Sequence, residues 1–468
     1  MIKEIKLFKD PSILLNKFAN IVFALIIIYS LLIVIFGIYR LYDHTIYHEK
    51  NIINQTYYIS IILIGSLSTI LFSIGQRRLH NSFKISLALF IIIFFIPVYA
   101  LETYLELSKL INFDTRTTQE VLDDLKKTGV QTYPNIYPSL FKTTNGLKTT
   151  NGRLYPLGGI SNITTTLGRE SGYYSIIEND EHGFNNPKGL YKKKQVDIML
   201  IGDSMTIGVA VHPNENISAT LRESGFNVIN LGKGDNSSLI EFATLREYVK
   251  PLQPKIVVWL YFVNDLPEIE VEIPILKKYL NDNTYSQNLI LRQDEIDTVL
   301  KKFILEKLKK EKTKKNEDSK LHIHTNNWAI KILKLNNIRS WINLAPKVQI
   351  APENIPEENL LIFKNILEKS DKIISEWGGI LYLAYLPGNR EYYTGIELPS
   401  YQLVLQTAKQ LNIPIIDMHK EVFESISNPL SLFPSKLHLH YNAKGYRLVG
   451  EAISKRLEND GVIASKLN

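Results

Sequence analysis

Three residues that could act together on an acyl group follow three apolar segments of this 468-residue chain. They are Ser204 after Val196–Ile201, Gly234 after Asn227–Leu231 and Asn264 after Ile256–Phe262, at an even spacing of 30 residues. A serine at a strand-to-helix turn presents its hydroxyl at the sheet edge, and its own N–H lies at a helix N-terminus, where developing negative charge is stabilised. A glycine N–H and an asparagine amide are further donors for an oxyanion. A turn or a helix cap also explains each residue singly, but the three together indicate a nucleophile facing an oxyanion hole.

The sequence around these residues resembles the SGNH/GDSL hydrolases, a family named for serine, glycine, asparagine and histidine in four sequence blocks. Within roughly residues 154–457, the matching segments are Ile201-Gly-Asp-Ser204, Asn230-Leu-Gly-Lys-Gly234-Asp, Tyr261-Phe-Val-Asn264-Asp265-Leu and His440-Tyr-Asn-Ala-Lys-Gly445-Tyr. The stretch Glu181-His-Gly-Phe-Asn-Asn-Pro187 also resembles membrane-attached bacterial members. The resemblance implies that Ser204 is the nucleophile and that His440 is the general base. It also implies that the N–H groups of Ser204 and Gly234 and the Asn264 amide form the oxyanion hole.

The residues just before His440 depart from the family pattern. The family usually has an aspartate two or three residues before the histidine to orient the imidazole, whereas those positions hold His438 and Leu437. We prefer His440 to His438 as the base because the residues that follow it, including Gly445, fit the family's spacing. Histidine, with an ordinary pKa of about 6.5, suits removal of the serine proton. Three alternatives stay open: a backbone carbonyl orients the ring, a distant acid such as Asp417 does so, or catalysis is weak.

The segments between these residues predict the scaffold that must position them. The expected strands are continuous apolar runs, as in strands covered on both faces: Val196–Ile201, Asn227–Leu231, Ile256–Phe262, Ile380–Leu386 and Ile413–Ile416. The expected helices lie between and after them: Ile217–Ser224, Leu239–Val249, Pro356–Glu376, Ser400–Leu411 and Ala443–Arg456. This alternation predicts an α/β fold with a doubly wound parallel sheet, flavodoxin-like by the resemblance. Ligands of such sheets bind at the carboxyl ends of the strands.

The first hundred residues predict a membrane anchor. Long stretches without charge run between Lys17 and Arg40 and between Lys50 and Arg77, and a third, Ile85–Leu101, contains Pro97. A helix needs about 20 apolar residues to cross the hydrocarbon core, so we expect spans at about 18–39, 57–75 and 85–101. No site for signal-peptide cleavage follows the first stretch.

Basic residues beside the spans predict the orientation of the chain. They gather in the N-terminal tail (Lys3, Lys6, Lys9 and Lys17) and in the second loop (Arg77, Arg78 and Lys84). The positive-inside rule puts both segments in the cytoplasm. We therefore expect a cytoplasmic (inner) membrane protein whose N-terminus is cytoplasmic and whose catalytic domain is periplasmic or extracellular.

The expected domains are a membrane anchor at 1–105, a linker at 106–153 and an SGNH hydrolase domain at 154–468. The linker has helical spacing only in Thr118–Lys127. A basic insertion around 301–320 carries nine lysines and four acids, and it is typical of a solvated helix end or flap.

Composition narrows the function classes. The net charge of +7 first suggests a nucleic acid or an anionic membrane, but the insertion alone contributes +5, and other basic residues mark membrane topology. We therefore expect no nucleic-acid partner. The absence of cysteine excludes disulfides, thiolate zinc sites and cysteine nucleophiles. We expect no cofactor and no metal.

These features predict a membrane-anchored, extracytoplasmic serine hydrolase that acts on esters, with O-acyl (acetyl) groups of a cell-envelope glycan as substrate. The substrate class follows from the resemblance and the topology, not from any residue. One alternative is an O-acyltransferase to a glycan hydroxyl, which would need an integral membrane partner to deliver the acyl donor. Another is a non-catalytic glycan-binding domain, which the missing aspartate makes conceivable.

Overall fold

The chain forms two compact units, which we call the helical unit (Met1–Ile111 with Ile323–Ala351) and the α/β unit (Asn112–His322 with Pro352–Asn468). The computed structural model describes residues 11–47, 52–193, 195–263, 265–266, 269, 274–318, 328–342, 355–394, 397–434 and 439–463. The division differs from the expected one in two places. Most of the expected linker folds with the α/β unit, and a segment that follows the basic insertion folds with the helical unit.

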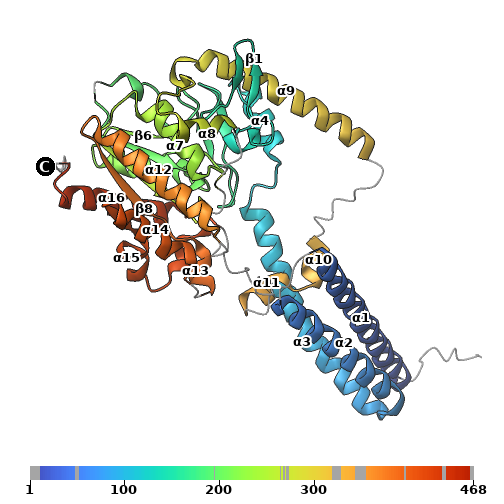
Figure 1. Cartoon of the computed structure of the whole chain (residues 1–468). Coiled ribbons are helices and arrows are strands. Elements are labelled where there is room, and N and C mark those ends of the chain that lie inside the picture. The colour runs from blue at the N-terminus through green and yellow to red at the C-terminus, as the bar shows by residue number, and fades with distance from the viewer. Residues whose placement is uncertain are drawn as a thin grey trace, which may run out of the picture. The chain divides into compact units, whose positions relative to one another are not determined.

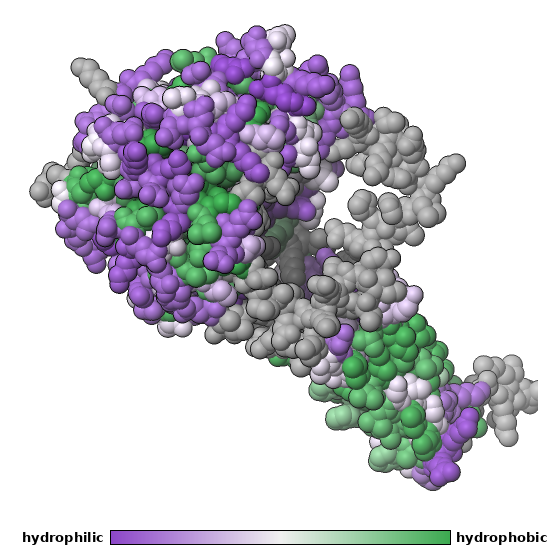
Figure 2. All heavy atoms as spheres, in the orientation of Figure 1, coloured by the Kyte–Doolittle hydropathy of each residue, from purple (hydrophilic) through white to green (hydrophobic). Residues whose placement is uncertain are grey.

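The helical unit is built on three long helices, α1 (Pro11–Tyr47), α2 (Ile52–Arg78) and α3 (Asn81–Asn112). Within them, Ser12–Tyr42, Gln55–Arg78 and Asn81–Ser108 are long and apolar enough to cross a membrane. Figure 2 shows the hydrophobic surface that these helices expose. Small residues let α1 and α2 approach closely, since a Cβ added at Gly65 would lie 2.8 Å from Val34 Cγ2.

Two short helices, α10 (Trp328–Leu333) and α11 (Asn336–Trp341), also belong to the helical unit. The buried carboxylate of Glu102 on α3 accepts hydrogen bonds from the backbone N–H groups of Asn337 and Ile338, both at 2.9 Å. The hydroxyls of Tyr29 and Tyr99 donate to the carbonyl of Leu333 at 3.1 and 3.4 Å. The Glu102 carboxylate thus satisfies two of the first N–H groups of α11, which have no partner within the helix, and the tyrosines satisfy a carbonyl at the end of α10.

The α/β unit is organised by a five-stranded parallel sheet in the order β6-β5-β7-β8-β9, which confirms the predicted fold class. Its strands are β5 (Ile198–Gly202), β6 (Val228–Asn230), β7 (Ile256–Tyr261), β8 (Ile380–Tyr385) and β9 (Ile415–Asp417). In register, Leu200 pairs with Asn230, and Gly202 pairs with Leu260. The strands that precede Ser204, Gly234 and Asn264 therefore end at one edge.

Helices cover both faces of this sheet (Figure 1). Met199, Val257 and Leu383 pack into one buried cluster, whereas Ile198 and Val258 pack into the other. Because neighbouring residues of a strand point to opposite faces, both faces of the sheet are apolar and covered, as continuous apolar runs predict.

The principal covering helices follow the predicted ranges closely. They are α6 (Ile217–Glu223), α7 (Ser238–Thr244) continued by a π-helical turn (Leu245–Val249), α12 (Glu357–Ser375), α14 (Pro399–Gln410) and α16 (Ala443–Asn459). Shorter helices are α5 (Ser204–Ile207), α8 (Pro274–Asn281), α13 (Asn389–Thr394) and α15 (Met418–Glu421). Residues 301–318 of the expected basic insertion make up most of one helix, α9 (Gln293–Asp318), and residues 319–320 lie outside the described residues.

The segment before the sheet forms its own small elements. These are α4 (Thr118–Lys127), a 3-10 turn (Pro138–Phe141) and two antiparallel hairpins, β1–β2 (Leu147–Thr149 and Gly152–Leu154) and β3–β4 (Thr164–Thr166 and Ile176–Glu178). Buried side chains of this segment, such as Phe141 and Leu154, join one of the two clusters beside the sheet. Residues 112–153 are therefore part of the α/β unit and not a spacer.

Candidate active site

Ser204 stands at the turn from β5 into α5. The carboxylate of Asp203 caps this helix by accepting the Met205 N–H at 2.9 Å. A Cβ at Gly202 would lie 2.1 Å from Thr206 Oγ1 and 2.7 Å from the carbonyl oxygen of Leu260. Only glycine allows so sharp a turn, which puts the first residue of α5 at the sheet edge.

Ser204, His440 and Glu170 form a continuous hydrogen-bonded chain. His440 Nε2 lies 2.8 Å from Ser204 Oγ, and His440 Nδ1 lies 2.8 Å from Glu170 Oε1. A carboxylate only accepts hydrogen bonds, so the neutral imidazole carries its proton on Nδ1 and offers the Nε2 lone pair to the serine hydroxyl. This is the arrangement of nucleophile, general base and orienting acid that activates a serine.

His440 is held by the start of α16. Asn442 caps that helix by accepting the Gly445 N–H at 3.0 Å, and its own N–H donates to the carbonyl of Leu432 at 2.8 Å. The buried Tyr441 donates its hydroxyl to the carbonyl of Pro387 at 2.6 Å. These contacts fix the backbone on the C-terminal side of His440, which is itself only 8% exposed.

Glu170 is the acid that the sequence analysis did not find. It lies in the loop between β3 and β4, and Ser171 beside it donates its hydroxyl to the carbonyl of Ala210, just after α5, at 2.5 Å. No motif spacing predicts this position, because Glu170 precedes Ser204 in the chain and lies 270 positions from His440. Its only sequence signal is an acid in a short polar loop ahead of the first block.

Asp417 does not orient the histidine in this structure. Its carboxylate accepts the Tyr401 hydroxyl at 2.6 Å and lies 3.6 Å from Lys420 Nζ. It ends β9, which is separated from β5 by β7 and β8. The sequence-based suggestion of Asp417 is thus corrected to Glu170, because two strands lie between β9 and β5, whereas the β3–β4 loop is held beside α5 and brings Glu170 to Nδ1.

Buried acids surround the nucleophile. Ser204 Oγ lies 3.2 Å from Asp203 Oδ2. Burial raises the pKa of Asp203 to about 6, and the Met205 N–H and His440 oppose this rise. Burial also raises the pKa of Glu241 well above its ordinary value, with the nearby Asp203 adding to the rise and the Trp259 N–H, 2.6 Å away, opposing it.

Gly234 reaches the site through the loop that follows β6. The N–H of Lys233 donates to the carbonyl of Gly202 at 3.3 Å, so this loop runs beside the turn that carries Ser204. A Cβ on Gly234 would lie 2.6 Å from Cε1 of Tyr137, a residue of the segment expected to be a linker. Among the described residues, the Gly234 N–H has no acceptor within the chain, which leaves it available to a ligand.

Two expected site residues, Asn264 and His438, lie outside the described residues. Asp265, next to Asn264 in the sequence, is buried and accepts the Phe262 N–H at 2.8 Å. Within the described ranges, no group of three or more His, Asp or Glu side chains is arranged to hold a metal ion.

Comparison with known proteins finds partial structural similarity only. No protein-family model matches the chain, and no curated protein sequence matches it. A solved structure described as a lipolytic protein of the G-D-S-L family from Desulfitobacterium hafniense DCB-2 is 17% identical, with a TM-score of 0.30, over 56% of this chain and 99% of that chain. The psychrotrophic esterase EstA from Pseudoalteromonas sp., inhibited by monoethylphosphonate, is 12% identical, with a TM-score of 0.29, over 56% and 97%. We rest the functional assignment on the geometry of the site.

Proposed function

We propose that this chain is a membrane-anchored serine hydrolase of the SGNH type that cleaves esters outside the cytoplasm. The observation that carries the proposal is the Ser204–His440–Glu170 chain at the carboxyl edge of the parallel sheet, with both hydrogen bonds at 2.8 Å. The availability of the Gly234 N–H beside this chain supports an oxyanion hole. The acid beside His440 also weighs against the alternative of a non-catalytic module, which was suggested by the missing aspartate.

In the proposed reaction, Ser204 Oγ attacks the ester carbonyl while its proton passes to His440 Nε2. The oxyanion is held by the N–H groups of Ser204 and Gly234 and by the Asn264 amide. When the C–O bond breaks, His440 gives the proton to the departing alcohol. Water then attacks the acyl-serine with His440 again as base, which releases the carboxylic acid and restores the hydroxyl. Glu170 stabilises the imidazolium in both halves.

The membrane setting points to the substrate class. Three apolar helices, with basic residues gathered in the N-terminal tail and the second loop, support a catalytic unit outside the inner membrane. The polymers met there are envelope glycans, so O-acyl groups such as O-acetyl on a glycan are the proposed substrate.

The proposal is tested with the full chain in detergent. Wild-type protein should release p-nitrophenol from p-nitrophenyl acetate and should take up a fluorophosphonate at Ser204, located by peptide mass. Ser204→Ala should lose both, whereas Ser218→Ala, at another buried serine of the same unit, should keep both. Equal hydrolysis by wild type and Ser204→Ala would refute the assignment. Adding an acceptor glycan distinguishes a hydrolase from an acyltransferase by the fate of the acetyl group.

The orientation is tested separately, which the natural absence of cysteine makes straightforward. A membrane-impermeant maleimide should label Asn151→Cys in intact cells and should label Arg78→Cys only after lysis. The reverse labelling pattern would place the catalytic unit in the cytoplasm.

A further inference from the structure

The loop that carries Glu170 is fastened to the first residues after α3. Inside the loop, the N–H of Ser175 donates to the carbonyl of Gly168 at 3.0 Å, and the N–H of Gly172 donates to that of Arg169, also at 3.0 Å. On one side, Ser171 holds the loop to Ala210 after α5. The other side lies against residues 114–116, which come from the segment expected to be a linker.

The contacts to residues 114–116 flank Glu170 in the sequence. The N–H of Asp114 donates to the carbonyl of Gly172 at 2.6 Å. The guanidinium of Arg169 donates to the carbonyls of Asp114 and Arg116 at 2.7 and 2.8 Å. The hydroxyl of the buried Tyr174 donates to the same Arg116 carbonyl at 2.8 Å. Backbone on both sides of the catalytic acid is thus tied to one short segment.

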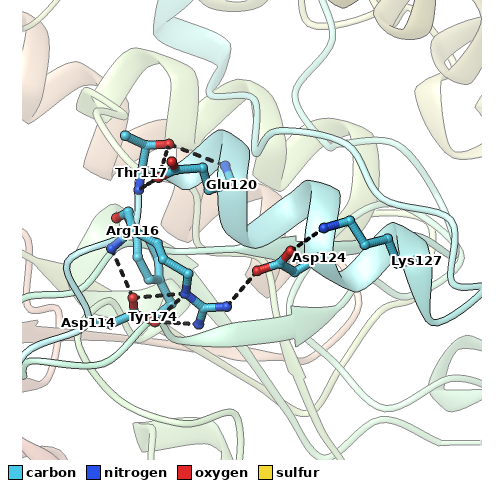
Figure 3. A network of polar contacts seen from close by, with 7 residues as sticks. All are labelled: Asp114, Arg116, Thr117, Glu120, Asp124, Lys127 and Tyr174. Atoms are coloured by element: carbon cyan, nitrogen blue, oxygen red, sulfur yellow. Dashed lines mark hydrogen bonds and ion pairs between the residues drawn. The ribbon is translucent and has the colours of Figure 1, made fainter.

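That segment is itself fixed in place. The guanidinium of Arg116 pairs with its neighbour Asp114 and reaches Asp124 on α4 at 3.0 Å, as Figure 3 shows. Thr117 and Glu120 form a capping box at the start of α4, with the Glu120 N–H donating to Thr117 Oγ1 at 3.2 Å. Most of these side chains are partly exposed, so single ion pairs contribute little. Together, however, the Arg116 contacts and the capping box tie residues 114–117 to the first turns of α4.

We propose that Asp114, Arg116, Arg169, Gly172 and Tyr174 form a clamp that positions Glu170 against Nδ1 of His440. The proposal rests on the proposed function, because it assigns these residues a role in the same triad. None of them contacts the imidazole or the reacting atoms, so they are positioning residues and not catalytic residues. Displacements of about 1 Å can cost up to 10²-fold in rate. Without the clamp, Ser171, Tyr173 and Ser175 would still hold the loop to residues 210–215, but that one side alone leaves the backbone around Glu170 free to shift.

Steady-state kinetics of full-length variants in detergent test the clamp. Arg169→Met removes the two guanidinium hydrogen bonds, and Tyr174→Phe removes one hydroxyl while keeping the ring. Lys127→Met is the matched control, because Lys127 belongs to the network of Figure 3 but, among the described residues, forms an ion pair with Asp124 alone. We expect kcat on p-nitrophenyl acetate to fall roughly 5- to 20-fold in Arg169→Met and about threefold in Tyr174→Phe. KM should stay within about twofold, and Lys127→Met should match wild type.

A double-mutant cycle separates positioning from general support of the fold. If Arg169 acts through Glu170, Arg169→Met should lower kcat hardly at all when Glu170→Gln is already present. The proposal would be overturned if Arg169→Met lowered kcat by the same factor with Glu170 and with Gln at position 170. It would also be overturned if Arg169→Met and Tyr174→Phe both kept the wild-type kcat. If Arg169→Met does not fold, the cycle is run with Tyr174→Phe. A Ser204→Ala protein as active as wild type would instead refute the hydrolase itself, so the two failures are distinguishable.

Discussion

Replacing Glu170 by glutamine removes the charge that faces the imidazolium and leaves the volume nearly unchanged. The Nδ1–Oε1 distance of 2.8 Å puts the charge centres about 4 Å apart, where an effective dielectric constant near 20 gives about 4 kcal/mol. The Glu170 side chain is 27% exposed and that of His440 is 10% exposed, so water screens part of this attraction. We therefore expect a loss of about 2–3 kcal/mol in transition-state stabilisation, or roughly a 30- to 160-fold lower kcat/KM.

The assay is initial-rate hydrolysis of p-nitrophenyl acetate by the full chain at constant pH, with Asp417→Asn as the matched control. Asp417 is the acid that the sequence suggested, but its carboxylate is engaged by Tyr401. Asp417→Asn should therefore stay within about threefold of wild type. The reasoning is refuted if Glu170→Gln keeps more than half of the wild-type kcat/KM. It is equally refuted if Asp417→Asn loses as much activity as Glu170→Gln.

Three further predictions concern burial and close packing. Because burial raises the folded-state pKa of Asp203 from 3.8 to about 6, the folded protein loses up to about 3 kcal/mol of stability as pH rises from 4 to 6. The Tm advantage of Asp203→Asn over wild type should therefore be larger at pH 7.5 than at pH 4.5, and an equal Tm difference at both pH values would contradict the raised pKa. Gly234→Ala should lower kcat/KM by at least tenfold, since its Cβ would meet the Tyr137 ring at 2.6 Å; adding Tyr137→Ala should restore part of the activity, and an unaltered Gly234→Ala rate would refute the contact. Glu102→Ala removes the acceptor of two α11 backbone N–H groups, which should weaken the attachment of α11 to α3 by about 1–3 kcal/mol. Trypsin should therefore cut the detergent-solubilised variant at Lys334 faster than wild type, and unchanged cleavage would count against this attachment.

The features of this protein that could be predicted from the sequence are those that depend on short, local sequence patterns. Apolar runs fixed the strands to within two residues, because a strand buried on both faces must be continuously apolar. The helix predicted at Thr118–Lys127 has those same bounds in the structure, since its capping box is local. Ser204 and His440 could be singled out because each belongs to a short motif next to a strand end or a helix start, and the structure places the two side chains within hydrogen-bonding distance.

Only the tertiary structure places an acid, Glu170, beside Nδ1 of His440. A carboxylate needs only to reach Nδ1, and any loop that passes the carboxyl edge can supply it, so no spacing rule leads to Glu170. For the same reason the linker assignment failed: Tyr137 and residues 114–116 have no motif, and only the folded chain sets them beside Gly234 and the Glu170 loop. Sequence by itself predicted the elements and three helices apolar enough to cross a membrane, and it singled out Ser204 and His440. Only contacts between residues far apart in the chain decided which acid lies beside His440 and which residues contact the loop that carries it, because these depend on how the loops close in space.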